Sequence, residues 1–480
     1  MPLLRSINSR WPWVMWVVFA VIYALIWVPN HLLLRTYALD LGLYTHALWQ
    51  YIHGRVADTA LFLDHQHPLL ADHFDLYLPL LSPLVMVFGS WTLLIVQWLA
   101  MLAGAWGVRH VLLLLGTSAR GSTIAMLVML LYFGMFTAVA FDYHSNVVAA
   151  MLLPWWLAAV LRQRPWQALA LWVLILVGKE NMGLWMGWLA LVTVIAAPIP
   201  DGMRRWVLAS ALIGWAWSVI VISWVMPALS TTGDYAHFDY RLLGEGIGSG
   251  LHAFMDRPGQ LFLALFTDHV GTPKGTAIKI EFWVLWLVAG GWAMIMRPVW
   301  MLMALPLLAQ KMWHDDPGKW SVVAHYSAEF APLIGIAIGR VLQRWPKPVI
   351  RVVVVVGALV ATVRCMDNTV AHQDRSRIRL YQAQHWTKPY ALDPVRAALD
   401  RIPADAALSA QSPAVPHAIE RTHLYQFPII GAADHILLLP QESPYPLDPS
   451  AYRLEVERLR HAAEWTVVID APEVILLHRR

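Results

Sequence analysis

Residues 11–34 read WPWVMWVVFAVIYALIWVPNHLLL, and this stretch decides the class of fold. A lipid core about 30 Å thick needs about 20 mostly apolar residues in a helix, and the segment meets that length. Trp11, Trp13 and Trp16 open it, as is typical of a helix end at a membrane interface. The apolar stretch is long and no small-x-small cleavage site follows it, which favours a retained span over a cleaved signal peptide.

The rest of the chain has the composition of a membrane protein. Of its 480 residues 58% are hydrophobic and only 14% are charged, and the mean hydropathy is +0.52. A soluble domain carries about a quarter charged residues, so the composition argues against a disordered protein, a secreted disulfide scaffold and a nucleic-acid binder. The one cysteine, Cys365, has no partner for an internal disulfide and no zinc motif, and we interpret it as a small apolar residue.

Ten further apolar runs follow the first, so we expect an α-helical polytopic membrane protein with about 11 spans. The runs cover about 91–115, 121–139, 145–161, 166–178, 182–198, 206–226, 282–296, 298–311, 324–342 and 348–364. The runs 166–178 and 298–311 are short enough to be tilted or re-entrant. Residues 74–90 are also apolar, but Pro79 and Pro83 interrupt them, and we expect a helix lying at the interface.

Lysine and arginine set the predicted orientation. With a cytosolic N-terminus, every short inner loop carries basic residues and almost no acid, Asp201 being the one clear exception. The basic residues are Arg5, Arg10, Arg109, Arg120, Arg162, Arg164, Arg204, Arg205, Arg297, Arg340, Arg344 and Lys347. We therefore expect a cytoplasmic (inner) membrane protein with its C-terminal end outside.

This orientation places three large pieces on the outer face: loops at about 35–90 and 227–281, and a tail from about 365. The tail alternates helix-like with strand-like runs, which suggests a small α/β domain. The helix-like runs are 393–401 and 450–463, and the strand-like runs are 436–439, 465–469 and 474–478. We thus expect a transmembrane domain at 1–364 and an extracytoplasmic α/β domain at 365–480, either a stabilising cap or an acceptor-binding module.

The first outer loop concentrates ionisable side chains. Six lie within residues 64–75: Asp64, His65, His67, Asp72, His73 and Asp75. Carboxylates and imidazoles together relay protons or hold a divalent metal ion, although the spacing matches no tight metal signature. A solvated loop is the alternative interpretation. For a metal, the candidate ligands are Asp64, His65, His67 and Asp75, and no other cofactor is indicated.

Three more polar clusters occur at predicted outer helix ends. They are Asp142-Tyr143-His144, Lys179-Glu180 and His325-Tyr326, the last followed by Glu329. Glu329 is the one carboxylate inside a predicted span, about one turn after His325, so the two could share a helix face. An acid at membrane depth indicates function by default, although a neighbouring helix could also satisfy it. Lys179-Glu180 could likewise be only an interfacial ion pair.

Seven short motifs together carry a resemblance. They are Asp40-Leu-Gly-Leu, Ala47-Leu-Trp49, Gly54, Asp72-His73-Phe74, Tyr143-His144, Lys179-Glu180 and His325-Tyr326-Ser327, in this order. With the span pattern, the set resembles a family of bacterial and archaeal predicted multi-spanning membrane proteins of unknown function. That family is similar to the GT-C superfamily of polyprenyl-phosphate-sugar-dependent glycosyltransferases. Asn181 stands where the family often has an acid, and Ser145 where a proline is common, which puts any role for an acid at 181 in doubt.

The resemblance implies a transferase that moves a sugar from a polyprenyl-phosphate donor to an acceptor at the outer face. Asp40, the acid just after the first span, would be the general base, with Asp72 and His73 as further catalytic candidates. The developing phosphate charge needs a cation, for which Lys179 and Arg55 are candidates. The other candidate substrate- or phosphate-binding residues are His144, Glu180, His325, Tyr326 and Glu329. The implied partners are membrane lipid and the lipid-linked donor, and no Gly-rich nucleotide loop occurs in the sequence.

Two other functions compete with this one. A transporter or lipid flippase places its substrate site near mid-bilayer and often has pseudo-repeated halves. Here the charged motifs gather at one face and no repeat is visible. A non-catalytic assembly subunit would use the outer loops and tail only to dock a partner. The sequence leaves the sugar, the acceptor and the oligomeric state open.

Overall fold

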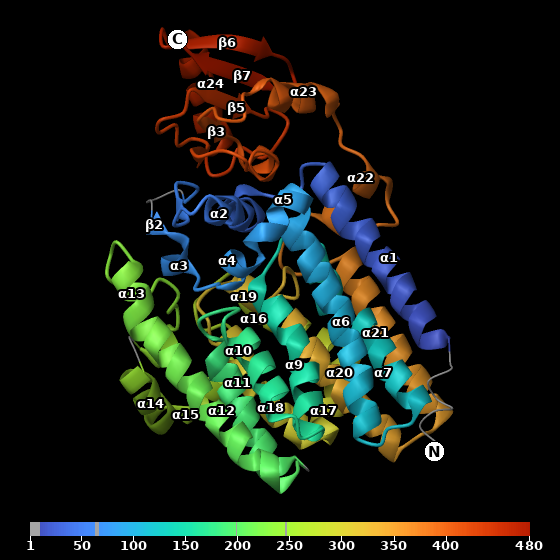
Figure 1. The fold of residues 1–480 in the computed structure, drawn as a ribbon. Helices are drawn as coiled ribbons and strands as arrows, with labels where there is room; N and C mark the ends of the chain where they lie inside the picture. Colours follow the sequence, from blue (N-terminus) through green and yellow to red (C-terminus); the bar gives the residue numbers. More distant parts are fainter. Residues whose placement is uncertain (1–9, 63–66, 198, 245–246) are drawn as a thin grey trace.

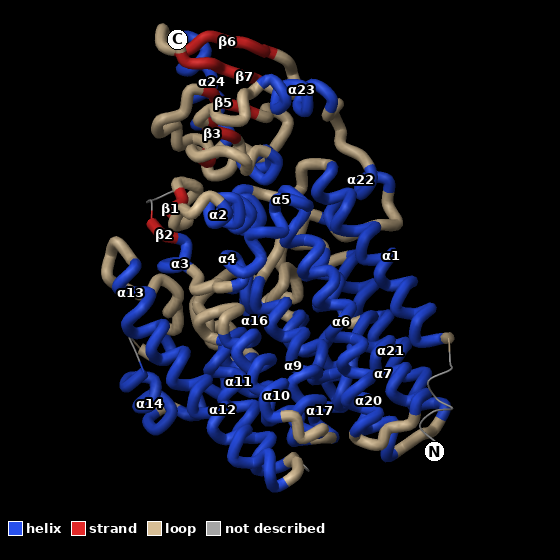
Figure 2. Tube along the Cα trace, in the orientation of Figure 1, coloured by secondary structure: helices blue, strands red, loops and turns tan. Residues whose placement is uncertain are grey.

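The computed structural model describes residues 10–62, 67–197, 199–244 and 247–480. A bundle of helices forms the larger part of the molecule, and a small sheet built from C-terminal residues lies beyond one end of it (Figure 1, Figure 2). Arg5, Asp64 and His65 lie outside the described residues. The multi-span helical fold and the small α/β domain are both confirmed.

Each of the eleven predicted spans contains helix. The bundle consists of α1 (Trp11–Leu32), α6 (Thr92–Leu114), α7 (Ala119–Leu131), α8 (Phe133–Val139), α9 (Ser145–Leu161), α10 (Pro165–Leu176), α11 (Met182–Ala196), α12 (Asp201–Ile220), α16 (Gly275–Trp286), α17 (Trp292–Met296), α18 (Pro298–Met312), α20 (Ala331–Arg344) and α21 (Pro348–Asp367). Within the described residues, five helical runs are long and apolar enough to cross a membrane, or six if the pair α7–α8, bent by 47°, is one span. Helices α9, α10 and α11 are apolar but shorter.

The first loop is largely helical. It contains α2 (Leu43–Ile52), β1 (Asp58–Thr59), β2 (His67–Pro68), α3 (Leu69–Asp72), α4 (Tyr77–Leu81) and α5 (Val85–Phe88). The apolar residues 74–90 form short helical pieces that continue directly into α6. The second loop contains α13 (Met226–Leu229), α14 (Ile247–Asp256) and α15 (Pro258–Ala264), and α16 begins at Gly275 rather than near residue 282.

The helix predicted over 324–342 begins later than its hydropathy indicates. Ala324 has a φ of 56°, a left-handed conformation that a helix cannot contain, and the first helical turn is a 3-10 turn at Ala328–Phe330. His325 therefore lies in the loop between α19 (Pro317–Trp320) and this turn, whereas Glu329 lies on it. The prediction that His325 and Glu329 share a helix face is wrong.

The C-terminal domain is a five-stranded mixed sheet in the order β4-β3-β5-β7-β6. Its strands are β3 (Leu408–Ala410), β4 (Leu424–Gln426), β5 (His435–Leu438), β6 (Trp465–Asp470) and β7 (Ile475–Arg479). β3 pairs in parallel with β4 and β5, and β7 pairs antiparallel with β5 and β6. Helix α24 (Pro449–His461) buries Tyr452, Val456 and Leu459 in a core shared with Ile436 and Trp465.

Buried polar contacts anchor this domain to the end of α1. Arg35 donates to the backbone carbonyls of Ser376, Gln384, His385 and Thr387 at 2.6–3.2 Å. Asn30 donates to the carbonyl of Arg377 at 2.8 Å. These contacts fix the connection through α22 (Ala383–Trp386) and α23 (Asp393–Arg401), so the sheet lies over the first loop (Figure 1).

Candidate functional site

Asp40 lies in an irregular turn, Ala38–Gly42, that joins α1 to α2. Its φ of 71° is unusual for a non-glycine residue and is sustained only where surrounding contacts fix the backbone. Two contacts do so: the Tyr37 N–H donates to Asp142 Oδ2 at 3.1 Å, and the Ala38 N–H donates to Ser412 Oγ at 3.1 Å. A Cβ at Gly42 would lie 2.9 Å from Val415 Cγ1, so the C-terminal domain packs directly on this turn.

A carboxylate and two imidazoles meet at this turn. Asp40 Oδ1 lies 3.3 Å from His144 Nε2. The ring of His144 stacks on that of His325, with centroids 3.4 Å apart and planes 19° apart. His144 Nδ1 faces the Asp142 carbonyl at 3.3 Å, so both ring nitrogens face acceptors. The three side chains come from the first loop, the N-terminal end of α9 and the loop before α20.

The Asp40 carboxylate is ionised and reachable. Burial alone would raise the pKa of Asp40, but the charge of His144 and the hydrogen bond from it outweigh burial, and the pKa is lowered. A third of its side chain is exposed, whereas the side chain of His144 is almost fully buried. An ionised carboxylate with an accessible oxygen can accept a proton from a bound hydroxyl group.

A second group of acid and imidazole side chains links the first and second loops to the α10–α11 turn. His237 Nε2 lies 3.0 Å from Asp72 Oδ1, and the rings of His237 and His73 stack with centroids 4.3 Å apart. His73 Nδ1 lies 3.7 Å from Glu180 Oε1. Glu180 also accepts from the Phe74 N–H at 3.2 Å. Sequence reasoning missed His237, whose only signal is its place in an outer loop.

The two carboxylates of this group are ionised despite their burial. Burial would raise the pKa of Asp72, but His73, His237 and Lys179 together lower it well below its usual range. Burial likewise opposes ionisation of Glu180, and the hydrogen bond with His73 and the charge of Lys179 lower its pKa to about 2. Burial and the charge of Lys179 lower the pKa of His73. This group therefore carries net negative charge at neutral pH.

Lys179 is a cation that influences both groups. Its charge acts on Asp72 and Glu180 in one group and on His325 in the other. It is half-buried, and within the described part of the chain its ammonium has no hydrogen-bond or ion-pair partner. Tyr44 packs beside the first group: its ring centroid lies 6.4 Å from that of His144 and 5.9 Å from that of Tyr143, whose hydroxyl donates to Asp75 at 3.5 Å.

The remaining predicted residues divide between this region and others. The Tyr326 ring lies 4.0 Å from His325, and Glu329 accepts from Asn146 Nδ2 at 3.1 Å. Arg55 is placed elsewhere. It follows α2, whose 10 residues span about 15 Å from the Asp40 turn, and it donates to Thr422 Oγ1 at 2.7 Å. The charge of Lys179 acts on His325, which stacks on His144, whereas Arg55 lies at Thr422.

One candidate metal centre occurs among the described residues. Ligand atoms of Asp72, His73 and His237 lie within 4.8 Å of one another. Two imidazoles and a carboxylate suit Zn²⁺, and the ring of His73 also faces Glu180, with Nδ1 3.7 Å from Oε1. Of the predicted ligands, Asp64 and His65 lie outside the described residues, as does the side chain of His67. Asp75 is absent from this centre because its carboxylate accepts from Tyr77 N–H at 2.9 Å in a buried position.

The chain resembles one family of membrane proteins in sequence and three solved structures in fold. The family described as "Predicted membrane protein (DUF2079)" matches residues 30–476. ArnT from Cupriavidus metallidurans bound to undecaprenyl phosphate superposes with a TM-score of 0.55 at 12% identity, covering 97% of each chain. The structure of the same ArnT in the apo state superposes with a TM-score of 0.54 at 13% identity, again covering 97% of each chain. The arabinofuranosyltransferase AftD from Mycobacteria gives 0.51 at 15%, covering 98% of this chain and 40% of AftD. No curated protein matches in sequence. The GT-C-like fold is therefore confirmed at the level of architecture.

Proposed function

The chain belongs to the DUF2079 family of predicted membrane proteins, and we propose that it is an integral-membrane glycosyltransferase. Its donor would be a sugar linked to a polyprenyl phosphate, and transfer would occur at the outer face of the cytoplasmic membrane. The observation that carries the proposal is the contact of Asp40 Oδ1 with His144 Nε2, at 3.3 Å, beside the stacked ring of His325.

In the proposed reaction Asp40 accepts the proton of an acceptor hydroxyl, and that oxygen attacks the anomeric carbon of the donor sugar. The bond between this carbon and the phosphate oxygen breaks, and the lipid phosphate leaves with the electron pair. Negative charge then grows on the phosphate, where the ammonium of Lys179 and the imidazole of His325 can stabilise it. His144 touches Asp40 and is a positioning residue for the base.

Two further observations support a lipid-linked donor. The chain has the fold of ArnT, which has been solved with undecaprenyl phosphate bound. The polar groups gather at one end of the apolar bundle, where α9 and α20 begin, so a phosphate could reach them while its isoprenoid chain stays in lipid. The group around Glu180 is negatively charged and would repel a phosphate. Its carboxylates can instead accept hydrogen bonds from the hydroxyl groups of a sugar.

The test is transfer by the purified full-length protein, supplied with a panel of polyprenyl-phosphate-linked sugars and assayed for release of polyprenyl phosphate. Asp40→Asn removes the base while preserving its size, and we expect a loss of about 100-fold or more. The matched control is Asp393→Asn on the exposed side of the C-terminal domain, with activity unchanged.

Full activity of Asp40→Asn would exclude Asp40 as the base. Absence of transfer with every donor, together with a lipid or solute flux in liposomes that depends on Glu329, would replace the transferase by a transporter. Both variants are first compared with the wild type by thermal melting, so that loss of the fold is not mistaken for loss of the base.

A further inference from the structure

A cavity of about 230 Å³ lies at the opposite end of the bundle from Asp40. Helix α9 begins at Ser145, beside His144, and ends at Leu161, which lines the cavity. At 1.5 Å per residue, its 17 residues separate the two places by about 25 Å. Leu115 follows α6, and Arg297 forms the turn between α17 and α18, so the cavity lies where several helices end.

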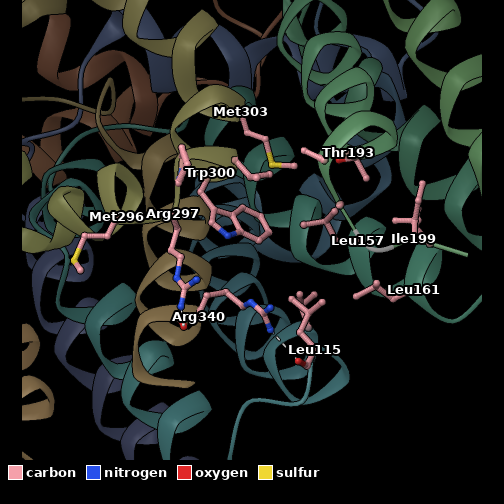
Figure 3. A pocket seen from close by; sticks show the side chains of 16 residues that line it. Leu115, Leu157, Leu161, Thr193, Ile199, Met296, Arg297, Trp300, Met303 and Arg340 are labelled. Carbon is pink, nitrogen blue, oxygen red and sulfur yellow. Dashed lines mark hydrogen bonds between the residues drawn. The ribbon is translucent and has the colours of Figure 1, made fainter. Parts of the chain in front are cut away.

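The walls of the cavity are almost entirely apolar. Figure 3 shows the indole of Trp300 in the middle, with Met303 and Leu157 on one side and two arginines on the other. Ala196 and Met296, which also line it, are exposed, so the cavity reaches the surface of the bundle. Among its described lining residues, Arg297 and Arg340 are the charged ones, and none is an acid.

These two arginines are held together without a counter-charge. Arg297 donates to the backbone carbonyl of Arg340 at 3.1 Å, and its buried Nε has no hydrogen-bond partner. Arg340 donates to the carbonyl of Leu115 at 2.9 Å and to Gln343. In the described part of the chain neither guanidinium pairs with a carboxylate. Two neighbouring cations repel each other, and an anion bound between them would relieve this repulsion.

We infer that this cavity binds an anionic phospholipid of the surrounding bilayer. Its phosphate would lie against Arg297 and Arg340, at the headgroup depth where the helices end, and one acyl chain would run past Trp300 and Leu157. The volume holds part of a chain and not a whole lipid, so the rest lies outside, in the bilayer. A small soluble anion would not need apolar walls. By the predicted orientation this end faces the cytosol, where basic pockets between helices bind acidic lipids.

The experiment is native mass spectrometry of the purified full-length protein with phosphatidylglycerol or with phosphatidylcholine of identical acyl chains. We expect tighter retention of phosphatidylglycerol by about tenfold or more, lost in the double variant Arg297→Gln with Arg340→Gln. Ala196→Phe fills the cavity while keeping both arginines, and we expect it to weaken retention as well. Arg344→Gln removes an exposed cation from the same end and should leave retention as in the wild type.

Four results would overturn the inference. The first is equal retention of both phospholipids. The second and third are undiminished phosphatidylglycerol binding by the double variant and by Ala196→Phe. The fourth is a loss in Arg344→Gln as large as in the double variant, which would indicate a diffuse attraction of the anionic lipid to the basic end of the bundle. A further arm adds undecaprenyl phosphate at equal concentration. If it displaces phosphatidylglycerol selectively, the cavity belongs to the polyprenyl carrier and the assignment to membrane phospholipid is wrong.

Discussion

Asp40 Oδ1 lies 3.3 Å from His144 Nε2, and each residue lies just before the start of a helix. Asp40 is in the turn that leads into α2, and His144 is the residue before α9. The backbone N–H of His144 donates to Oε1 of the buried Gln97 on α6 at 2.8 Å. His144 is therefore held by α6 as well as by α9, and these two helices pack against each other.

Replacing His144 should impair the base without removing it. In His144→Gln the charge that lowers the pKa of Asp40 is lost, burial then dominates, and that pKa rises. Since the base works only when ionised, the acidic limb of the kcat/KM profile should move to higher pH, with kcat reduced about 10- to 100-fold. Steady-state kinetics across pH measure both effects. An unshifted limb would contradict this role, and His53→Gln, an exposed histidine after α2, is the control.

Lys179 should act mainly on the phosphate of the donor. Lys179→Gln removes a cation that acts on both polar groups, so we expect weaker binding of polyprenyl phosphate by about tenfold and a further loss in kcat. Lys179→Arg should recover part of the binding because it restores the charge. Binding of the lipid phosphate without acceptor separates these effects. Unchanged affinity in Lys179→Gln would rule out a phosphate contact, and Lys347→Gln, an exposed lysine before α21, serves as the control.

The group of Asp72, His73 and His237 allows a direct test of metal binding. We expect Zn²⁺ to raise the melting temperature of the metal-stripped protein, since a ligand at 100 times its Kd stabilises by about 2.7 kcal/mol. His237→Gln should abolish most of this rise, because it removes one of three ligands. His252→Gln, in α14 of the same loop, should retain it. An equal rise in both variants would place the metal elsewhere.

The sequence predicted the helices well because hydropathy is local. Each apolar run contains helix, and Asp40, His144 and His325 converge because they lie in connections between helices on one side of the bundle. The late start before α20 escaped notice because the left-handed backbone of Ala324 leaves no trace in hydropathy. In the described residues five or six helical runs are long and apolar enough to cross a membrane, compared with about 11 predicted spans. The other predicted spans contain helices too short to be judged by length.

The contacts between residues of different loops could not be predicted from the sequence. His237 is one histidine in a long loop, and its contact with Asp72 depends on how two loops fold over each other. The ion pair of Arg377 with Asp142, at 3.0 Å, joins the tail to the turn before α9. Arg55 looked suitable as a phosphate ligand by charge and loop, yet α2 carries it toward Thr422.

Breaking the Arg377–Asp142 pair should release the tail from the site. Both side chains are buried, and Asp142 also accepts from the Tyr37 N–H, so Arg377→Met leaves a buried carboxylate without its counter-charge. We expect a loss of about 3–5 kcal/mol in the free energy of unfolding. The double variant with Asp142→Asn should recover part of it. Thermal melting measures the stability of each variant, with the exposed Arg396→Met as control. If the double variant recovers nothing, the two side chains do not stabilise the protein through their contact.

Docking of the C-terminal domain should weaken in acid through His46. This α2 residue is buried, and its Nε2 lies 3.0 Å from the carbonyl of Arg421 in the C-terminal domain. Burial lowers the pKa of His46 to about 4, and the charges of Arg421 and Arg55 act in the same direction. The unfolded chain, with a pKa near 6.5, therefore binds more protons between these two values, so the free energy of unfolding falls as pH decreases from about 6.5 to about 4.

His46→Gln keeps a side-chain donor for the Arg421 carbonyl but cannot be protonated. It should remove part of the acid-induced decrease in stability, by up to about 1.4 kcal/mol per pH unit in that interval. The measurement is the melting temperature of the wild type and of His46→Gln at pH 7.5, 6 and 5. Other buried histidines are present in both proteins, so their contributions cancel when the two are compared. Because His46 contacts the tail directly, protease cleavage between the two domains should increase in parallel in the wild type. If the two proteins lose stability equally, the protonation of His46 does not control docking.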